Sequence, residues 1–294
     1  MGVTVQVPAT TANMGPGFDS LGCAFALYNR FTFEFAEVTS VHGCDDAFKG
    51  EDNLALVAFR ETCLYAGVTP CAVKLTIDAD IPVSSGLGSS ASLLVGGAMG
   101  ANRLLNLNLS KDDIFKIASR LEGHPDNIAP AVFGGLTAAL TDENGESHVV
   151  TYPISKVWSF CAFANPDLRI STKEARSVLP ASYSRADAVF NGTHVALLPA
   201  VLMYGDIKLL PVVLQDKLHE PYRTPLIADY QPMMKAAKEA GAHAFFLSGS
   251  GPTCMAIYTD AEFPGKMMTA VQTISSHWNV LPLAIDREGV TQIG

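Results

Sequence analysis

Charged residues are scarce in this sequence, and those present lean to the acidic side. Only 17% of the 294 residues are charged, and the excess of Asp and Glu gives a formal net charge of −9. Nucleic-acid phosphates and anionic headgroups repel an acidic chain. We therefore expect that this protein is not a general binder of nucleic acids or membrane surfaces. The 48% hydrophobic share instead predicts a compact folded protein, long enough for two domains.

Cysteine pairs at metal-binding spacing are missing, since the six cysteines form no C-x-x-C pair. Zinc sites and thiol–disulfide sites commonly use that spacing, so we predict reduced core thiols. No continuous apolar run approaches the roughly 20 residues needed to cross a bilayer. Residues 1–6 carry no signal-peptide pattern. These absences predict a cytoplasmic protein without a membrane partner.

One loop, residues 82–92, organises the sequence. Before it, apolar and polar residues alternate over 73–78, which predicts a strand; after it, apolar residues recur at helical spacing. A helix N-terminus offers unpaired N–H groups, glycine permits close approach, and serine hydroxyls bind phosphate oxygens or Mg²⁺. We therefore predict a nucleotide-phosphate loop. It consists of Pro82, Val83, Ser84, Ser85, Gly86, Leu87, Gly88, Ser89, Ser90, Ala91 and Ser92.

Three other interpretations of this loop were weighed. A Gly/Ser turn that only caps a helix stays open on composition alone. A Walker A loop is excluded, because no Gly-Lys-Ser/Thr follows the glycines. Gly86, Gly88 and Ala91 do satisfy G-x-G-x-x-G/A, but residues 80–85 separate them from the strand. A dinucleotide fingerprint lies directly at a strand end, so its context is wrong here.

Two further polar clusters are candidates for a site. Thr4–Val7 is expected to be a short strand, followed by a loop over 8–19 in which Asn13 and Asp19 bracket a Gly-Pro-Gly turn. That turn would aim both side chains into one cavity. Residues 122–127, Glu-Gly-His-Pro-Asp-Asn, follow a predicted helix. They form either a solvated polar cap or a site whose carboxylate binds Mg²⁺.

These strings resemble the GHMP kinases, the family of galactokinase, homoserine kinase, mevalonate kinase and phosphomevalonate kinase. Pro-x-x-x-Gly-Leu-Gly-Ser-Ser-Ala is similar to their phosphate loop, residues 8–22 to the first motif of homoserine kinases, and residues 246–254 to the third GHMP motif. The resemblance implies an α+β protein with the GHMP kinase fold. Residues 1–155 would form a ribosomal-protein-S5 domain-2-like half that binds the nucleotide, and residues 156–294 a ferredoxin-like half.

The resemblance to homoserine kinases also implies an activity: ATP-dependent phosphorylation of L-homoserine to O-phospho-L-homoserine, a step toward threonine, with Mg²⁺. ATP would contact the phosphate loop and Asn53, which is most simply a helix N-cap. Ser90 and Glu122 would hold Mg²⁺. The implied catalytic residues are Arg176, Asp126 and Asn127. The implied substrate contacts are Asn13, Asp19, His124, Asn127, Thr172, Arg176 and Arg223.

Several alternatives remain at this point. Asp126 matches the catalytic aspartate of mevalonate kinases, yet homoserine kinases are often described as working without a base, so its role stays open. Arg176 could be an ordinary surface residue of a short helix capped by Ser171 or Thr172. The substrate could be mevalonate or a sugar. A nucleotide-sensing homologue without turnover is a further alternative, and the resemblance leaves room for a homodimer.

Overall fold

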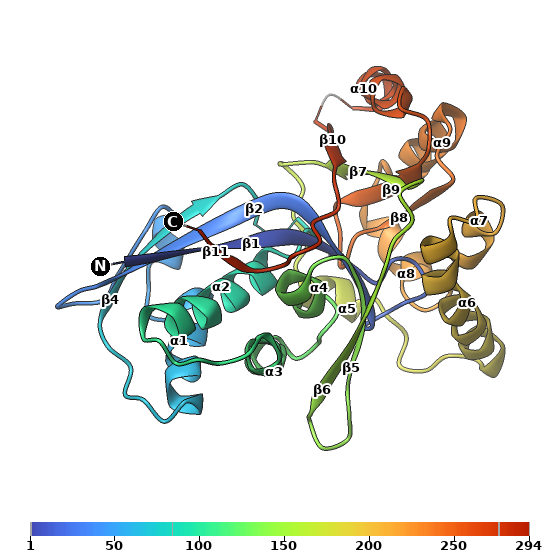
Figure 1. Ribbon diagram of the computed structural model, residues 1–294. Coiled ribbons are helices and arrows are strands. Elements are labelled where there is room, and N and C mark those ends of the chain that lie inside the picture. Colours follow the sequence, from blue (N-terminus) through green and yellow to red (C-terminus); the bar gives the residue numbers. More distant parts are fainter. Residues whose placement is uncertain (1, 84, 276, 294) are drawn as a thin grey trace.

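The computed structural model describes residues 2–83, 85–275 and 277–293, which form two sheets with helices packed against them (Figure 1). The first sheet has seven strands in the order β11-β1-β2-β4-β3, with β5 paired to β2 and β6 to β5. The second sheet has four strands in the order β10-β7-β9-β8. The mixed architecture confirms the predicted α+β class.

The first sheet is antiparallel except where β3 runs parallel to β4. Its strands are β1 (Gly2–Ala12), β2 (Leu21–Phe35), β3 (Ser40–His42), β4 (Val73–Ala79), β5 (Leu136–Thr141), β6 (Ser147–Tyr152) and β11 (Thr291–Ile293). One face of the sheet is covered by helices (Figure 1). These are α1 (Leu54–Tyr65), α2 (Ser89–Leu104), α3 (Lys111–Glu122) and α4 (Ile128–Phe133). A short 3-10 helix, η1 (Asp46–Phe48), precedes α1.

Strand β1 is longer than the sequence predicted. It continues past Val7 to Ala12, so the small residues over 8–12 are strand and not loop. The pairing of β1 with β2 shifts register between Pro8 and Ala9, and this irregularity accommodates the proline. The extension carries the chain directly to Asn13 at the edge of the cavity described below.

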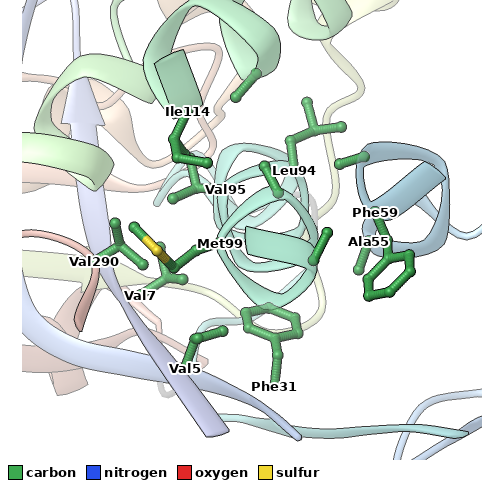
Figure 2. Packing of buried hydrophobic residues seen from close by; sticks show 14 of the residues in the cluster. Val5, Val7, Phe31, Ala55, Phe59, Leu94, Val95, Met99, Ile114 and Val290 are labelled. Atoms are coloured by element: carbon green, nitrogen blue, oxygen red, sulfur yellow. The ribbon is translucent and has the colours of Figure 1, made fainter. Parts of the chain in front are cut away.

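Helix α2 is the centre of the first hydrophobic core (Figure 2). Met99 lies beside the sheet residue Val7, and Val95 lies beside Ile114 of α3 (Figure 2). The helix lies close to its neighbours because three glycines face them. A Cβ on Gly96 would lie 2.3 Å from the Phe31 ring, and one on Gly100 would lie 2.2 Å from the Phe33 ring. A Cβ on Gly97 would lie 2.1 Å from the Ala55 carbonyl oxygen.

The second half has the strand order of a ferredoxin-like sheet. Its strands are β7 (Ser159–Ala164), β8 (Ala244–Leu247), β9 (Cys254–Tyr258) and β10 (Asn279–Leu283), all antiparallel. Numbered within this half, their order is 4-1-3-2, which confirms the predicted ferredoxin-like half. The remaining helices are α5 (Thr172–Ser177), α6 (Arg185–Tyr204), α7 (Leu210–Val213), α8 (Glu220–Arg223), η2 (Thr224–Leu226), α9 (Tyr230–Ala240) and α10 (Phe263–Ile274).

The two halves are joined by a strand pairing and by a common hydrophobic core across the expected domain boundary. Residues 155 and 156 lie in the connection between β6 and β7, and that boundary stays a prediction. Strand β11, close to the C-terminus, pairs with β1 in the first sheet. The core between the sheets combines Ala9 and Leu21 of the first half with Phe160 and Leu198 of the second.

Among the described residues, α6 is the one helix that approaches membrane-spanning length and composition, although polar residues over 191–194 interrupt its apolar run. Residues 188–205 contain no Asp, Glu, Lys or Arg. The 20-residue helix is long and apolar enough to cross a membrane when it is judged by length and composition alone. This is weak evidence for a membrane segment. One side of the helix packs on the protein through Asn191, Leu198, Val201 and Leu202.

All six cysteines are free thiols, and Cys23, Cys63, Cys161 and Cys254 are buried. Burial raises the pKa of Cys161 to about 12, so this thiol remains protonated at neutral pH.

The glycines of α2 give a prediction for stability. Gly97→Ala should lower the free energy of unfolding by about 1–3 kcal/mol, because the methyl group would force α1 and α2 apart. The matched control is Gly192→Ala in α6, where nothing lies within 4 Å of the added Cβ. That change should stabilise the protein by about 0.4–1 kcal/mol. Urea unfolding of both variants tests the pair, and equal effects of the two substitutions would contradict the packing argument.

Candidate active site

A cavity of about 560 Å³ lies where the two halves meet, and most of the predicted site residues line it. The first half supplies the phosphate loop and the segment after α3, and the second half supplies side chains from α5 and α8. The predicted residues that line the cavity are Asn13, Asp19, Asn53, Val83, Ser85, Gly86, Gly88, Ser89, Ser90, Ala91, Glu122, His124, Asp126, Asn127, Thr172, Arg176 and Arg223.

Three of the predicted nucleotide contacts lie elsewhere. Leu87 and Ser92 are fully buried, and the Ser92 hydroxyl donates to the Ser89 carbonyl at 2.8 Å and accepts from Asn29 Nδ2 at 2.8 Å. The carbonyl of Pro82 accepts from Ser85 Oγ at 2.8 Å. These residues lie behind the loop and are not among the cavity-lining residues, and their contact with the nucleotide stays a prediction. Ser84 lies outside the described residues.

The phosphate loop has the backbone conformation that its glycines permit. Gly86 and Gly88 have φ values of +85° and +72°, and Gly88 precedes the first residue of α2. The first N–H groups of a helix have no partner within it, so α2 presents donors and a positive dipole end at residues 89–91. A Cβ on Gly88 would lie 2.0 Å from Thr10 Oγ1, so this position tolerates only glycine.

Both halves of the protein hold the phosphate loop. Ser248 Oγ donates to the Gly86 carbonyl at 2.6 Å, and the backbone N–H of Thr253 donates to the Ser85 carbonyl at 3.0 Å. From the first half, the N–H of Thr10 donates to the Leu87 carbonyl at 3.1 Å. The third motif, which belongs to the second half, therefore lies directly against the loop and supports it through hydrogen bonds.

Asn53 lies at an apolar end of the cavity. Its Oδ1 accepts from the Ala55 N–H at 3.0 Å, which makes it the N-cap of α1, and its Nδ2 donates to the Phe48 carbonyl at 2.8 Å. The adenine contact of Asn53 stays a prediction. Apolar side chains suit a flat heterocycle at this end, and they are Ala47, Phe48, Leu54, Ile77 and Ile81.

Two hard oxygen donors meet beside the phosphate loop. Ser90 Oγ, in the first turn of α2, donates to Glu122 Oε2, the last residue of α3, at 2.7 Å. Mg²⁺ prefers oxygen and usually keeps several waters and substrate phosphates among its ligands, so a serine–carboxylate pair fits it. Among the described residues, no group of three or more His, Cys, Asp or Glu side chains could hold a metal alone.

The polar segment after α3 is joined by hydrogen bonds. His124 Nδ1 lies 2.8 Å from Asp126 Oδ1, and the same oxygen accepts from the Asn127 N–H at 2.8 Å. Thr10 Oγ1 donates to Asn127 Oδ1 at 2.8 Å. Burial lowers the pKa of His124, but the carboxylates of Asp126, Glu122 and Asp19 raise it more. The net effect is a raised pKa for His124. Asp126 therefore orients His124. The contact of Thr10 with Asn127 was not predicted from the sequence.

The opposite wall carries two arginines with different partners. Arg176 makes a two-pronged ion pair with Asp19, with N–O distances of 2.7 and 3.1 Å. Arg223 is 2% exposed and donates to the carbonyls of Ala175 and Gly249 at 3.1 and 3.2 Å. Among the described residues, no carboxylate lies within ion-pair distance of Arg223. Burial and the nearby Arg176 both lower the pKa of Arg223.

Residues near Arg223 that the sequence did not single out hold it in place. The Asp216 carboxylate accepts from Asn191 Nδ2 and from the backbone N–H groups of residues 218–220, at 2.7 to 3.0 Å. Glu220 accepts from the Leu247 N–H at 2.7 Å, and burial raises its pKa to about 8. These contacts fix α8 against β8. The sequence analysis indicated Arg223 but not the residues that hold it.

A glycine-rich loop and a helix N-terminus from one half, facing arginines from a ferredoxin-like half, define a GHMP-type small-molecule kinase. Two family models agree with this class. The GHMP kinases N terminal domain matches residues 53–135, and the GHMP kinases C terminal domain matches residues 202–271.

Individual relatives narrow the class. The chain is 41% identical over 290 residues to a homoserine kinase from Clostridium botulinum, covering 98% of this chain and 97% of that protein. A homoserine kinase from Clostridium beijerinckii is 40% identical over 295 residues, with 99% and 98% covered. The solved structure of homoserine kinase from Cytophaga hutchinsonii matches with a TM-score of 0.90 and 28% identity, covering 99% of this chain and 97% of that one. The chain therefore belongs to the homoserine kinases of the GHMP kinase family.

The Ser90–Glu122 pair gives a prediction about Mg²⁺. Ser90→Ala and Glu122→Gln should each weaken Mg²⁺-dependent ATP binding by about 10–100-fold, because each removes a hard oxygen donor. Titration calorimetry with ATP, with and without Mg²⁺, measures this independently of turnover. Ser119→Ala is the matched control, since Ser119 lies in α3 near Glu122, is buried, and is not among the cavity residues. Unchanged Mg²⁺ dependence in both site variants would remove them from the metal site.

Proposed function

We propose that this protein transfers the γ-phosphoryl group of ATP to the hydroxyl of L-homoserine, giving O-phospho-L-homoserine and ADP. The observation that carries the proposal is Arg223, a buried guanidinium on the cavity wall without a carboxylate partner among the described residues. A buried cation is costly unless it is paired, so this position favours an anionic ligand. The carboxylate of an amino acid fits, because arginine can give it two parallel hydrogen bonds.

The other groups of an amino-acid substrate also have matching partners. Asp19 is the acidic side chain beside the two arginines, and a carboxylate can accept an ammonium while it remains paired with Arg176. Asn13 fixes this loop, since its Oδ1 accepts from the Asp19 N–H at 3.0 Å and its Nδ2 donates to Gly249 at 2.9 Å. Thr172 and His124 line the same space and are the further substrate contacts we propose.

The transfer needs positioning and charge stabilisation more than covalent participation by the protein. The substrate hydroxyl oxygen forms a bond to the γ-phosphorus as the bond from the γ-phosphorus to the β–γ bridging oxygen breaks. ADP is the leaving group, and the hydroxyl proton passes to water. The α2 N-terminus and Arg176 would stabilise the phosphoryl charge. Bound Mg²⁺ would neutralise the phosphates beside Ser90 and Glu122. Asp126 holds His124, and Asn127 is held by Thr10, so these side chains would orient the reacting hydroxyl.

The cavity favours this substrate over the alternatives. Mevalonate has no ammonium for Asp19, and a neutral sugar has neither an ammonium nor a carboxylate for Arg223. A nucleotide-sensing homologue would not need Ser90, Glu122 and Arg176 to line one cavity together. We also infer that the product serves threonine biosynthesis, that the protein is cytoplasmic, and that neither nucleic acid nor membrane is a partner. A homodimer stays a prediction for light scattering to check.

A coupled ADP-release assay tests the proposal most directly. Purified protein is given Mg²⁺–ATP with L-homoserine, mevalonate or galactose in parallel. Turnover with homoserine at a kcat/KM at least about tenfold above the other two is the expected outcome, corresponding to about 1.4 kcal/mol of discrimination. Preference for mevalonate or galactose would assign a sister kinase, and ATP binding without ADP release would favour the nucleotide sensor.

The two arginines should respond differently to substitution. Arg223→Lys should raise the KM for homoserine strongly with a smaller effect on kcat, because lysine keeps the positive charge but cannot give the carboxylate two parallel hydrogen bonds. Arg176→Ala should lower kcat most, because we place it beside the reacting phosphoryl group.

The control for Arg223 is 3-aminopropanol, which is homoserine without its carboxylate. Steady-state kinetics of wild type and Arg223→Lys with both compounds form a double-mutant cycle. A penalty confined to homoserine supports carboxylate recognition. An equal penalty on both compounds would show that Arg223 does not bind the carboxylate.

A further inference from the structure

The ring of Phe18 lies beside both arginines of the cavity. Its centroid is 5.0 Å from Cζ of Arg223 and 5.5 Å from Cζ of Arg176. The three residues come from separate parts of the chain: the loop after β1, helix α8 and helix α5. Phe18 is half-buried and directly precedes Asp19.

Two guanidinium groups close to one point repel each other. Asp19 neutralises one of them, because both of its oxygens bond Arg176. Arg223 has only carbonyl partners among the described residues. The face of an aromatic ring carries partial negative charge and attracts a guanidinium within about 6 Å of its centroid. Phe18 therefore attracts both cations, in addition to Asp19, and it is the neutral group that lies against both.

The Phe18 ring is itself held in position by His219. The two rings stack with their centroids 5.3 Å apart and an interplanar angle of 20°. His219 is fully buried, and its Nε2 donates to the Gly15 carbonyl at 2.8 Å. Gly15 has a φ of +69°, and a Cβ there would lie 2.4 Å from the Leu214 carbonyl oxygen. The loop that carries Phe18 is thus tied to the segment that carries Arg223.

We propose that Phe18 is a positioning residue that fixes the separation of Arg176 and Arg223 and so selects the chain length of the amino-acid substrate. The proposal rests on the proposed function. With the carboxylate on Arg223 and the reacting hydroxyl beside Arg176, the distance between the two guanidinium groups sets the number of carbons that fit. Homoserine is one carbon longer than serine and one shorter than 5-hydroxynorvaline.

Two variants separate the charge of the ring from its bulk. Phe18→Leu removes the aromatic face, and 3,4,5-trifluorophenylalanine at position 18 keeps the ring but withdraws electron density from its face. The assay measures kcat/KM for L-serine, L-homoserine and 5-hydroxy-L-norvaline, together with the KM for ATP. In both variants the ratio of kcat/KM for homoserine to kcat/KM for 5-hydroxynorvaline should fall about tenfold, while the KM for ATP stays unchanged.

The chain offers a matched control in Phe190, away from the cavity. Its ring stacks on His194 at 3.7 Å, and Lys217 Nζ lies 4.5 Å from its centroid, so it has the same kinds of partner as Phe18. Phe190→Leu should leave the chain-length preference at the wild-type value. Thermal unfolding of every variant checks that the fold is intact, and the trifluoro variant preserves the ring if Phe18→Leu does not fold.

Wild-type turnover of homoserine is the first arm of the experiment. Its absence would overturn the proposed function, and the Phe18 proposal with it. Normal wild-type turnover with an unchanged chain-length preference in the folded trifluoro variant would overturn the Phe18 proposal alone. A loss of preference in Phe190→Leu equal to that in the Phe18 variants would also overturn it, because the effect would then be general.

Discussion

The active-site cavity depends on one junction, where three backbone segments meet around Ser248. Its hydroxyl donates to the Gly86 carbonyl at 2.6 Å and lies 2.8 Å from Thr11 Oγ1. The N–H of Gly249 donates to the Ala12 carbonyl at 3.2 Å, and Gly86 approaches so closely that a Cβ there would lie 2.5 Å from the Ser248 carbonyl oxygen. The phosphate loop, the end of β1 and the third motif are therefore positioned by one set of short contacts.

Charge is distributed around this junction according to function. The α2 N-terminus and the Ser90–Glu122 pair lie on one side, where phosphates and Mg²⁺ would bind. Arg176, Asp19 and Arg223 lie on the other, where an amino acid would bind. Burial makes each unpaired charge expensive, so part of the cost of folding Arg223 into the wall is recovered when an anion binds. The cavity would then select the ligand whose own charges pair with all the buried charges of its wall.

Local features of the fold were predictable from sequence because their causes are local. Asn53 caps α1 as its position before an apolar helical pattern indicated, and Ser110 forms a capping box with Asp113 at the start of α3. The glycine turn before α2 was predictable for the same reason, while its contact with a nucleotide stays a prediction. Contacts between distant residues could not be predicted from spacing. Asp19 and Arg176, or Phe18 and His219, meet only through the fold. The length of β1 likewise depends on its pairing with β2.

The shared support of the phosphate loop has a thermodynamic consequence. Residues 85–87 are held by Thr10 from one half and by Ser248 and Thr253 from the other, so the loop keeps its shape only while both halves are folded and in contact. A ligand that binds this loop binds neither half alone. By linkage, its binding free energy adds to the stability of the interface as well as to that of each half. Nucleotide binding would thus make the two halves unfold as a single cooperative unit.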